Sequence, residues 1–181
     1  MAQINIQYMS TAFGELMLGS FQNKLCLCDW RYRKMRERVD SRIKSQLDAN
    51  YVLANDSVIT QAVAELNQYF KGERDQFDVA ILLVGTDFQK RVWLQLQQVA
   101  YGETASYLQL ASDLGDVKAI RAVATANGAN ALSIIVPCHR IIGSDGKLVG
   151  YAGGLESKKK LLSLEANTVG AGGMRESLAL F

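Results

Sequence analysis

The sequence predicts an α/β protein in two parts: a small antiparallel sheet with helices, then a mostly helical part that holds a short cysteine-bearing turn. Near the N-terminus apolar and polar residues alternate, as they do in a half-buried strand. Beyond Gly85 the apolar residues recur with a helical period. The only proline and the only histidine of the chain flank one cysteine, in Pro137-Cys138-His139-Arg140. We therefore look for function first at this cysteine.

Bulk composition is that of a folded globular protein: 181 residues, 49% hydrophobic and 21% charged. A net charge of +2 does not by itself indicate nucleic-acid binding. No signal peptide is visible, and the longest apolar run, 79–85, is too short to cross a membrane. Three cysteines, an odd number, favour a reducing compartment over a disulfide framework. We expect a cytoplasmic protein, or a nuclear one if the source is a eukaryote, with no membrane contact.

The first elements are predicted to be a three-stranded meander over residues 4–8, 16–18 and 25–30. An amphipathic helix follows over 31–47, where apolar residues recur every four positions. Five basic residues lie between positions 31 and 38. We interpret this charge run as a solvent-exposed helix face rather than a DNA contact.

The next elements are a helix that Asp56 caps and Gly72 ends, and a strand over 77–84. Gly85 then marks a boundary, because the residues beyond it are mainly helical. The expected division is an N-terminal α/β domain, a C-terminal domain and a tail, over 1–84, 85–166 and 167–181.

In the C-terminal domain Thr86 or Asp87 opens a helix that closes near Gly102. Ser106, with Gln109 three residues later, has the form of a capping box. The helix it starts ends at the glycine at 115, and a second helix follows over 117–127 with an aspartate cap at 116. This is helix-turn-helix spacing, which fits DNA binding and also fits a plain helical hairpin. A last helix is expected over 158–165.

The second helix of this pair has unusually small side chains, at residues 119, 122, 124, 126 and 128, and Arg121 is nearly its only long one. Such a helix can approach a DNA backbone closely, and its arginine can fill the gap left by an extruded base. Tight packing against the rest of the domain is the alternative.

A strand over 134–136 is expected to deliver Cys138 to its turn. A thiol becomes a strong nucleophile when an imidazole with an acidic partner promotes its ionisation. His139 is adjacent, and Glu165 is the best-placed acid. An inert buried cysteine beside a structural histidine is the alternative. Cys26 and Cys28 are expected to be free buried thiols, and no metal site is predicted, since no zinc-type spacing results.

These motifs resemble the O6-alkylguanine-DNA alkyltransferases, also called methylated-DNA–protein-cysteine methyltransferases. The core of the resemblance is Ile135-Val136-Pro137-Cys138-His139-Arg140-Ile141-Ile142-Gly143, followed by Gly150-Tyr151-Ala152-Gly153-Gly154. Upstream and downstream segments fall at the family's spacing, namely Phe88-Gln89, Val92-Trp93, Tyr107, Arg121-Ala122-Val123, Asn127-Gly128-Ala129-Asn130, Lys158, Leu161-Leu162 and Glu165. The resemblance is specific over 85–165 and looser over 1–84.

The resemblance implies a ribonuclease H-like N-terminal part and a DNA repair enzyme, a methylated-DNA–protein-cysteine S-methyltransferase. It would flip O6-alkylguanine, or O4-alkylthymine, out of duplex DNA and transfer the alkyl group once, irreversibly, to Cys138. His139 would be the water-mediated base, Glu165 its orienting carboxylate, Tyr107 the proton donor to the leaving guanine and Asn130 a hinge residue.

Binding roles follow from the resemblance in the same way. Arg121 would replace the flipped base, and the helix would enter the minor groove through Ala119, Ala122 and Gly128, with Tyr107 as a further DNA-binding residue. The base pocket would be lined by Tyr151, Ala152, Gly153 and Trp93, and Val136 would supply backbone contacts to the base. The expected partner is double-stranded DNA carrying O6-alkylguanine, bound by a monomer that needs no cofactor.

The chain departs from the family at two positions: Asp87 stands where many members have proline, and Asn130-Ala131 stands where many have Asn-Pro. It also lacks the N-terminal histidine that the zinc-binding members would need. Three rival functions are a damage sensor without an acceptor cysteine, a helix-turn-helix regulator and a thiol hydrolase. The presence of Cys138 argues against the first, and the short N-terminal part leaves no room for the second.

Overall fold

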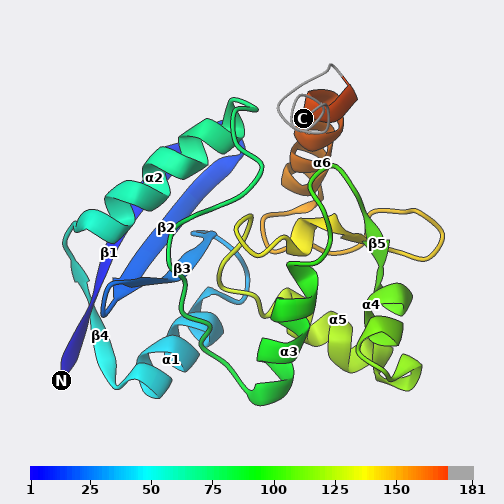
Figure 1. Cartoon of the computed structure of the whole chain (residues 1–181). Coiled ribbons are helices and arrows are strands. Elements are labelled where there is room, and N and C mark those ends of the chain that lie inside the picture. The colour runs from blue at the N-terminus through cyan, green and yellow to red at the C-terminus, as the bar shows by residue number, and fades with distance from the viewer. Residues whose placement is uncertain (171–181) are drawn as a thin grey trace.

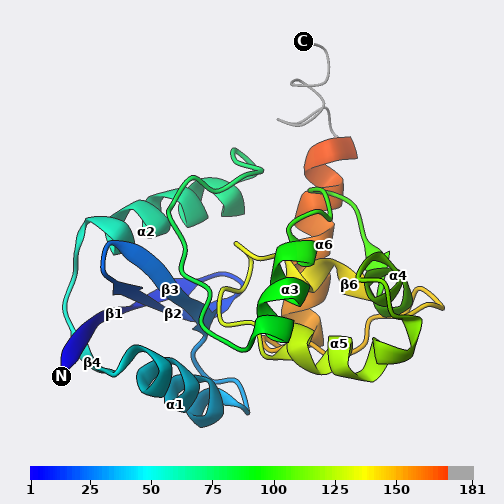
Figure 2. The same cartoon turned by 60° about the horizontal axis from the view of Figure 1, so that its bottom comes forward.

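A computed structural model describes residues 1–170 and has the expected α/β architecture in two parts (Figure 1). The N-terminal part is a four-stranded sheet with one helix on each face, α1 and α2, as Figure 2 shows. The C-terminal part gathers the remaining helices beyond the β3 edge of this sheet. Among the described residues no helix is both long and apolar enough to span a bilayer.

The sheet has the strand order β3-β2-β1-β4 and is mixed rather than purely antiparallel. The predicted meander is confirmed as β1 (Ala2–Thr11), β2 (Gly14–Phe21) and β3 (Lys24–Trp30), which pair antiparallel. A fourth strand that the sequence did not indicate, β4 (Ala49–Leu53), pairs parallel to β1. Its one fully buried residue, Ala49, gives too little alternation to reveal it.

Two amphipathic helices cover the sheet. Helix α1 (Arg36–Leu47) buries Val39 and Ile43 against one face, and it begins five residues later than expected because 31–35 form a turn. Helix α2 (Ser57–Phe70) covers the other face. Its predicted cap is confirmed, since the Asp56 carboxylate accepts a hydrogen bond from the Ile59 amide at 2.9 Å.

The expected strand over 77–84 is wrong: this segment makes one parallel bridge, from Ile81 to Leu25 of β3. Farther along the same edge the amide of Cys28 donates to the carbonyl of Ala131, and the amide of Ser133 donates back to Cys28. Two irregular segments therefore share the hydrogen bonds of the β3 edge, so neither forms a full strand. The second of them carries the chain toward Cys138.

The C-terminal part is mainly helical and contains α3 (Asp87–Leu96), β5 (Ala105–Ser106), α4 (Tyr107–Asp113), α5 (Ile120–Gly128), β6 (Ile141–Ile142) and α6 (Leu155–Gly170). Thr86 and Ser106 cap α3 and α4 with their side chains, as expected, although α3 ends at Leu96 rather than near 102. The predicted second helix of the hairpin starts with a 3₁₀ turn over 117–119 before α5 begins.

Two further expectations are wrong, one about a strand and one about the end of the last helix. The residues 134–136 do not form a strand, because Ile134 has a φ of +73°, which breaks an extended backbone. Helix α6 continues to Gly170, so 167–170 belong to a helix and not to a tail. The rest of the expected tail, 171–181, lies outside the described residues.

A buried ion cluster joins the two parts. Asp29, at the end of β3, is fully buried and accepts hydrogen bonds from Arg33 at 3.0 Å and Arg36 at 3.1 Å. Its other oxygen accepts from the Ser133 hydroxyl at 3.1 Å. Removing one partner of a buried pair leaves charges without compensation, which costs several kcal/mol. The cluster should therefore dominate the stability of the junction.

We expect Asp29→Asn to lower the free energy of unfolding by about 3–5 kcal/mol, because the buried guanidinium of Arg33 loses its counter-charge and Arg36 keeps only Asp40. Chemical denaturation of both proteins measures this difference. The matched control is Asp78→Asn, since Asp78 pairs with Arg74 at 3.2 Å on the surface, and should change stability by less than about 1 kcal/mol. Equal effects from the two substitutions would contradict the assigned role of the cluster.

Candidate active site

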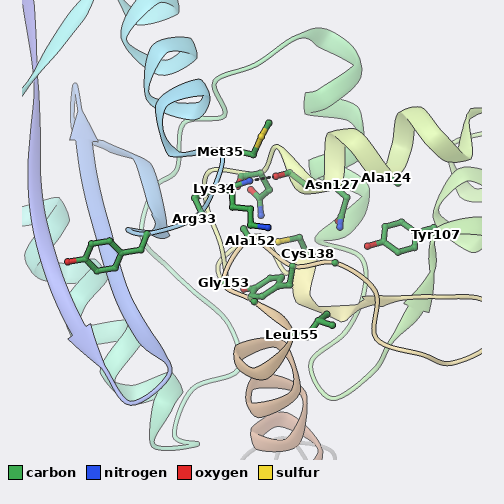
Figure 3. A pocket seen from close by; sticks show the side chains of 16 residues that line it. Arg33, Lys34, Met35, Tyr107, Ala124, Asn127, Cys138, Ala152, Gly153 and Leu155 are labelled. Atoms are coloured by element: carbon green, nitrogen blue, oxygen red, sulfur yellow. Dashed lines mark hydrogen bonds between the residues drawn. The ribbon is translucent and has the colours of Figure 1, made fainter.

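Cys138 lies at the start of a 3₁₀ turn, 138–140, directly after Pro137. Because of this turn, the two adjacent side chains point in different directions. Cys138 lines a cavity of about 690 Å³, while His139 points to the interior and is fully buried. Figure 3 shows Cys138 at the centre of this cavity. The lining residues are Tyr32, Arg33, Lys34, Met35, Tyr107, Ala124, Asn127, Gly128, Asn130, Cys138, Gly150, Tyr151, Ala152, Gly153, Gly154 and Leu155.

Glu165, on α6, forms a hydrogen bond with the imidazole of His139. Its carboxylate oxygen Oε2 lies 2.6 Å from Nε2 of His139, and Oε1 accepts from Nε of Arg140 at 2.8 Å. The Tyr69 hydroxyl of α2 donates to Oε2 at 2.6 Å, and the Gly102 amide donates to Oε1 at 3.2 Å. Segments distant in the sequence are thus held on one buried carboxylate.

The charge state of this pair follows from its surroundings. Burial alone would raise the pKa of Glu165, but the hydrogen bond from His139 and the hydrogen bonds and charge of Arg140 outweigh it and hold that pKa well below its usual range. Burial lowers the pKa of His139 and outweighs the opposing effect of the Glu165 carboxylate. The charge of Arg140, which pairs with that carboxylate, lowers the pKa of His139 further. A neutral ring that donates from Nε2 to Glu165 presents Nδ1 as an acceptor. That atom has no hydrogen-bond partner among residues 1–170.

The thiol itself is protonated in the resting protein. Burial raises the pKa of Cys138 above its ordinary value, and a hydrogen bond from Asn130 offsets only part of that effect. Asn130 also fixes the turn that leads to the cysteine, because its side chain donates to the Val136 carbonyl at 2.9 Å and accepts from the Leu132 amide at 3.0 Å. A base is therefore needed before Cys138 can act as a nucleophile.

Two tyrosines and a glycine shape the cavity. Tyr107, the first residue of α4, lines it and donates to the Val149 carbonyl at 3.2 Å. Tyr151 packs edge-on against Trp30, with ring centroids 5.9 Å apart. A Cβ at Gly153 would lie 2.6 Å from the Trp30 ring, so this close approach requires glycine.

Lys158 has a structural role that the sequence did not indicate. It is fully buried, and its ammonium donates to the carbonyls of Ile141, Val149 and Gly150. Three carbonyl acceptors match the three donors of an ammonium group, which explains how a lysine is tolerated there. The lysine thereby ties the cavity-lining loop to the strand that follows the cysteine turn.

The other side of the cavity is α5. Arg121 and Ala122 are exposed on its outer face, Ala119 is half-buried just before it, and Gly128 reaches the cavity rim. Arg121 itself does not line the cavity.

The cavity lining does not include Trp93 or Val136. Trp93 is buried in the α3–α5 interface, where its indole donates to the Ala126 carbonyl at 2.8 Å, and it does not line the cavity. The side chain of Val136 is also fully buried. Both apolar side chains are used for packing, which their spacing in the motif does not reveal.

The remaining thiols are free and buried in the sheet. Burial raises the pKa of Cys26 to about 12 and raises that of Cys28 as well. In the part of the chain that the structure describes, no cluster of three or more potential metal ligands occurs.

Sequence reasoning did not anticipate the cavity residues contributed by the N-terminal half, Tyr32 to Met35. The one available signal was the basic run over 31–38, whose position relative to Cys138 depends on tertiary packing.

Comparisons with known proteins agree on one family. Residues 87–167 match the family described as 6-O-methylguanine DNA methyltransferase, DNA binding domain. A Mycobacterium tuberculosis protein named methylated-DNA–protein-cysteine methyltransferase is 56% identical over 104 residues, 58% of this chain and 63% of the relative. The chain thus matches less than two thirds of that relative's length. A Methanosarcina barkeri protein of the same name is 47% identical over 117 residues, 65% of this chain and 74% of the relative.

Solved structures extend the likeness to the whole fold. The structure titled Mycobacterium tuberculosis OGT in complex with DNA has a TM-score of 0.76 and 38% identity, and covers 92% of this chain and 94% of that one. The O6-methylguanine-DNA methyltransferase of Pyrococcus kodakaraensis has a TM-score of 0.65 at 24% identity, covers 90% of this chain and 98% of that one, and shares the fold.

The Glu165 site predicts a pH dependence of stability. The lowered pKa of Glu165 stabilises the fold above the ordinary value of about 4.3, and this contribution is lost as pH falls through the folded pKa. The lowered pKa of His139 acts earlier, because the unfolded ring binds its proton near ~6.5 while the buried ring does not. Acidification should therefore destabilise the protein in two stages.

Glu165→Gln should remove the contribution of Glu165 to the loss below about pH 4.3 and cost about 3–5 kcal/mol at neutral pH, because Arg140 loses its counter-charge. Urea unfolding at a series of pH values checks both effects. Glu156→Gln, at an exposed acid in the first turn of the same helix, is the control and should change stability by no more than about 0.5 kcal/mol. A variant that keeps the full acid-side loss would refute the assignment.

Proposed function

The chain belongs to the methylated-DNA–protein-cysteine methyltransferase family, and from this premise we propose that it repairs DNA by taking an alkyl group from O6 of guanine onto Cys138. The observation that carries the proposal is a buried thiol and a neutral imidazole on one turn, beside a cavity bordered by a small-sided helix. The acceptor cysteine is present, which separates this function from that of a sensor that only binds damaged bases.

The transfer is a displacement at carbon. The Cys138 sulfur forms a bond to the alkyl carbon, and the bond from that carbon to O6 breaks, with its electron pair leaving on guanine. Tyr107 protonates the departing base, and the proton that the thiol gives to His139 passes through water to replace the one that Tyr107 lost, so no net proton is gained or released. General acid catalysis of this kind contributes about 10²–10⁴-fold.

His139 supplies the base for the thiol. Burial keeps Cys138 protonated at neutral pH, so a proton acceptor is required. The unpartnered Nδ1 of a buried, neutral ring is the available acceptor, reached through a water molecule, and Glu165 fixes the ring and stabilises its charged form. The product is a thioether, a poor leaving group, so each molecule acts once and no cofactor takes part.

Duplex DNA is the proposed partner, and the O6-alkylated guanine is flipped into the cavity. Helix α5 lies in the minor groove, where its small residues allow close approach, and Arg121 fills the stack in place of the base. Tyr151, Ala152 and Gly153 form the wall of the base pocket. Asn130 acts as the hinge between α5 and the cysteine turn.

We further propose that the chain acts as a monomer with a boundary near Gly85. The part over 1–84 then supports the part over 85–166, which carries the acceptor and the DNA-binding helix.

Intact mass spectrometry tests the function directly. Incubation with a duplex containing O6-methylguanine should add one methyl group to the protein, and peptide mapping should place it on Cys138, because Cys26 and Cys28 are buried without a base. Cys138→Ser should gain nothing, while Cys26→Ser should gain the methyl group normally. A label on Cys26 or Cys28, or repeated turnover, would rule out the proposed reaction.

A second prediction separates base flipping from chemistry. Arg121→Ala should slow repair of duplex DNA by about tenfold or more, because extruding a base costs a few kcal/mol that the inserted side chain offsets. Its reaction with free O6-benzylguanine should change far less. Single-turnover rates on both substrates measure the ratio, with Lys71→Ala, at an exposed lysine after α2, as the control. Equal losses on both substrates would indicate a structural role for Arg121.

A further inference from the structure

The cavity around Cys138 has two rims of different chemistry. One rim is built by Tyr107 of α4 and by Ala124 and Gly128 of α5. An adjoining rim comes from the N-terminal half of the chain, from the turn between β3 and α1 that carries Lys34 and Met35 (Figure 3). A nucleotide that enters this cavity therefore lies close both to α5 and to the N-terminal turn.

The N-terminal turn is held firmly against α5. Arg33, which Asp29 anchors, donates to the carbonyl of Gly128 at 2.5 Å and to that of Asn130 at 3.2 Å. Arg42 of α1 donates to the Ala129 carbonyl at 2.8 Å. Cations on the last carbonyls of a helix are favourable, because these carbonyls carry the negative end of the helix dipole. The turn and the end of α5 thus form one rigid surface.

The basic run over 31–38 divides into two groups. Arg31, Arg33 and Arg36 are paired with acidic residues at 2.8–3.1 Å. Lys34 and Arg38 are exposed, and neither has an ion-pair partner within the described residues 1–170. An unpaired cation on a built surface remains available to an external anion.

The two unpaired cations lie at openings beside α5. Lys34 lines the cavity of Cys138. Arg38 lines an adjoining cleft of about 380 Å³ between α1 and α5, together with Thr125 and Gly128. The neighbouring acid, Glu37, lines neither of them. The charge facing the outer side of α5 from this direction is therefore positive.

We propose that Lys34 and Arg38 form a phosphate-binding site for the DNA strand that carries the damaged nucleotide, on the rim that the N-terminal turn and α1 build beside α5. The proposal rests on the proposed function, because a nucleotide whose base enters the cavity has its own phosphates close to the cavity rim. The α5 rim offers small side chains for close approach, and the N-terminal rim offers the cations that neutralise phosphates. The interpretation of the whole basic run as a solvated helix face is thereby replaced for these two residues.

The test compares two double variants that lower the net charge equally. One is Lys34→Gln with Arg38→Gln. The control is Lys24→Gln with Lys71→Gln, since Lys24 begins β3, at the strand end remote from Trp30, and Lys71 follows α2. Both are made in a Cys138→Ser background, so that a duplex containing O6-methylguanine binds without reacting. The measurement is the dissociation constant over a series of salt concentrations.

The Lys34/Arg38 variant should bind about tenfold more weakly at low salt, and its slope of log Kd against log salt should fall by about 1.8, as expected for two lost phosphate contacts. The control should keep the slope of the parent. Arg38→Gln alone should remove about half of the change, and the charge-conserving Lys34→Arg with Arg38→Lys should restore the slope. Thermal melting verifies that the variants fold.

Equal slopes for the two double variants would overturn the phosphate site while leaving the proposed function intact. A parent protein that binds no DNA, or a wild-type protein that accepts no methyl group, would instead overturn the proposed function, and the phosphate site with it.

Discussion

The buried carboxylate of Glu165 is the interaction on which the site depends. It joins α6 to α2, to the loop before β5 and to the turn of the cysteine, through Tyr69, Gly102, His139 and Arg140. An ionised carboxylate in the interior is costly unless its lone pairs are all used, and here the guanidinium of Arg140 balances its charge. Burial and the nearby charge of Arg140 together leave the imidazole neutral, so that it can accept a proton.

A second buried carboxylate, Asp29, performs a related task at the other end of the same segment. It fixes Ser133 and Arg33, and through Arg33 the end of α5. The cysteine turn is therefore attached at both ends, to the sheet by Asp29 and to the last helix by Glu165. The N-terminal part of the chain is a structural component of the site, because one of these attachments and one rim of the cavity belong to it.

The features of the fold that could be predicted from the sequence depend on residues close together along the chain. The caps at Asp56 and Ser106 depend on side chains within three residues, and both helices begin as expected. The fold class and the family also followed from the sequence, because the motif around Cys138 is long. The wrong elements depend on partners far along the chain: Ile81 contacts Leu25 at a single bridge, and the backbone at Ile134 follows from contacts with the sheet. The packing role of Trp93 was hidden for the same reason.

The hydrogen bonds of the site also have a kinetic consequence. Tyr69 and Glu165 are separated by 96 residues, and Asp29 and Ser133 by 104. Contacts of such high sequence separation require closure of long loops, which slows their formation relative to local helices. The oriented imidazole therefore arises late in folding, when α6 docks, so the reactive form of the thiol is acquired together with the complete tertiary structure and not before it.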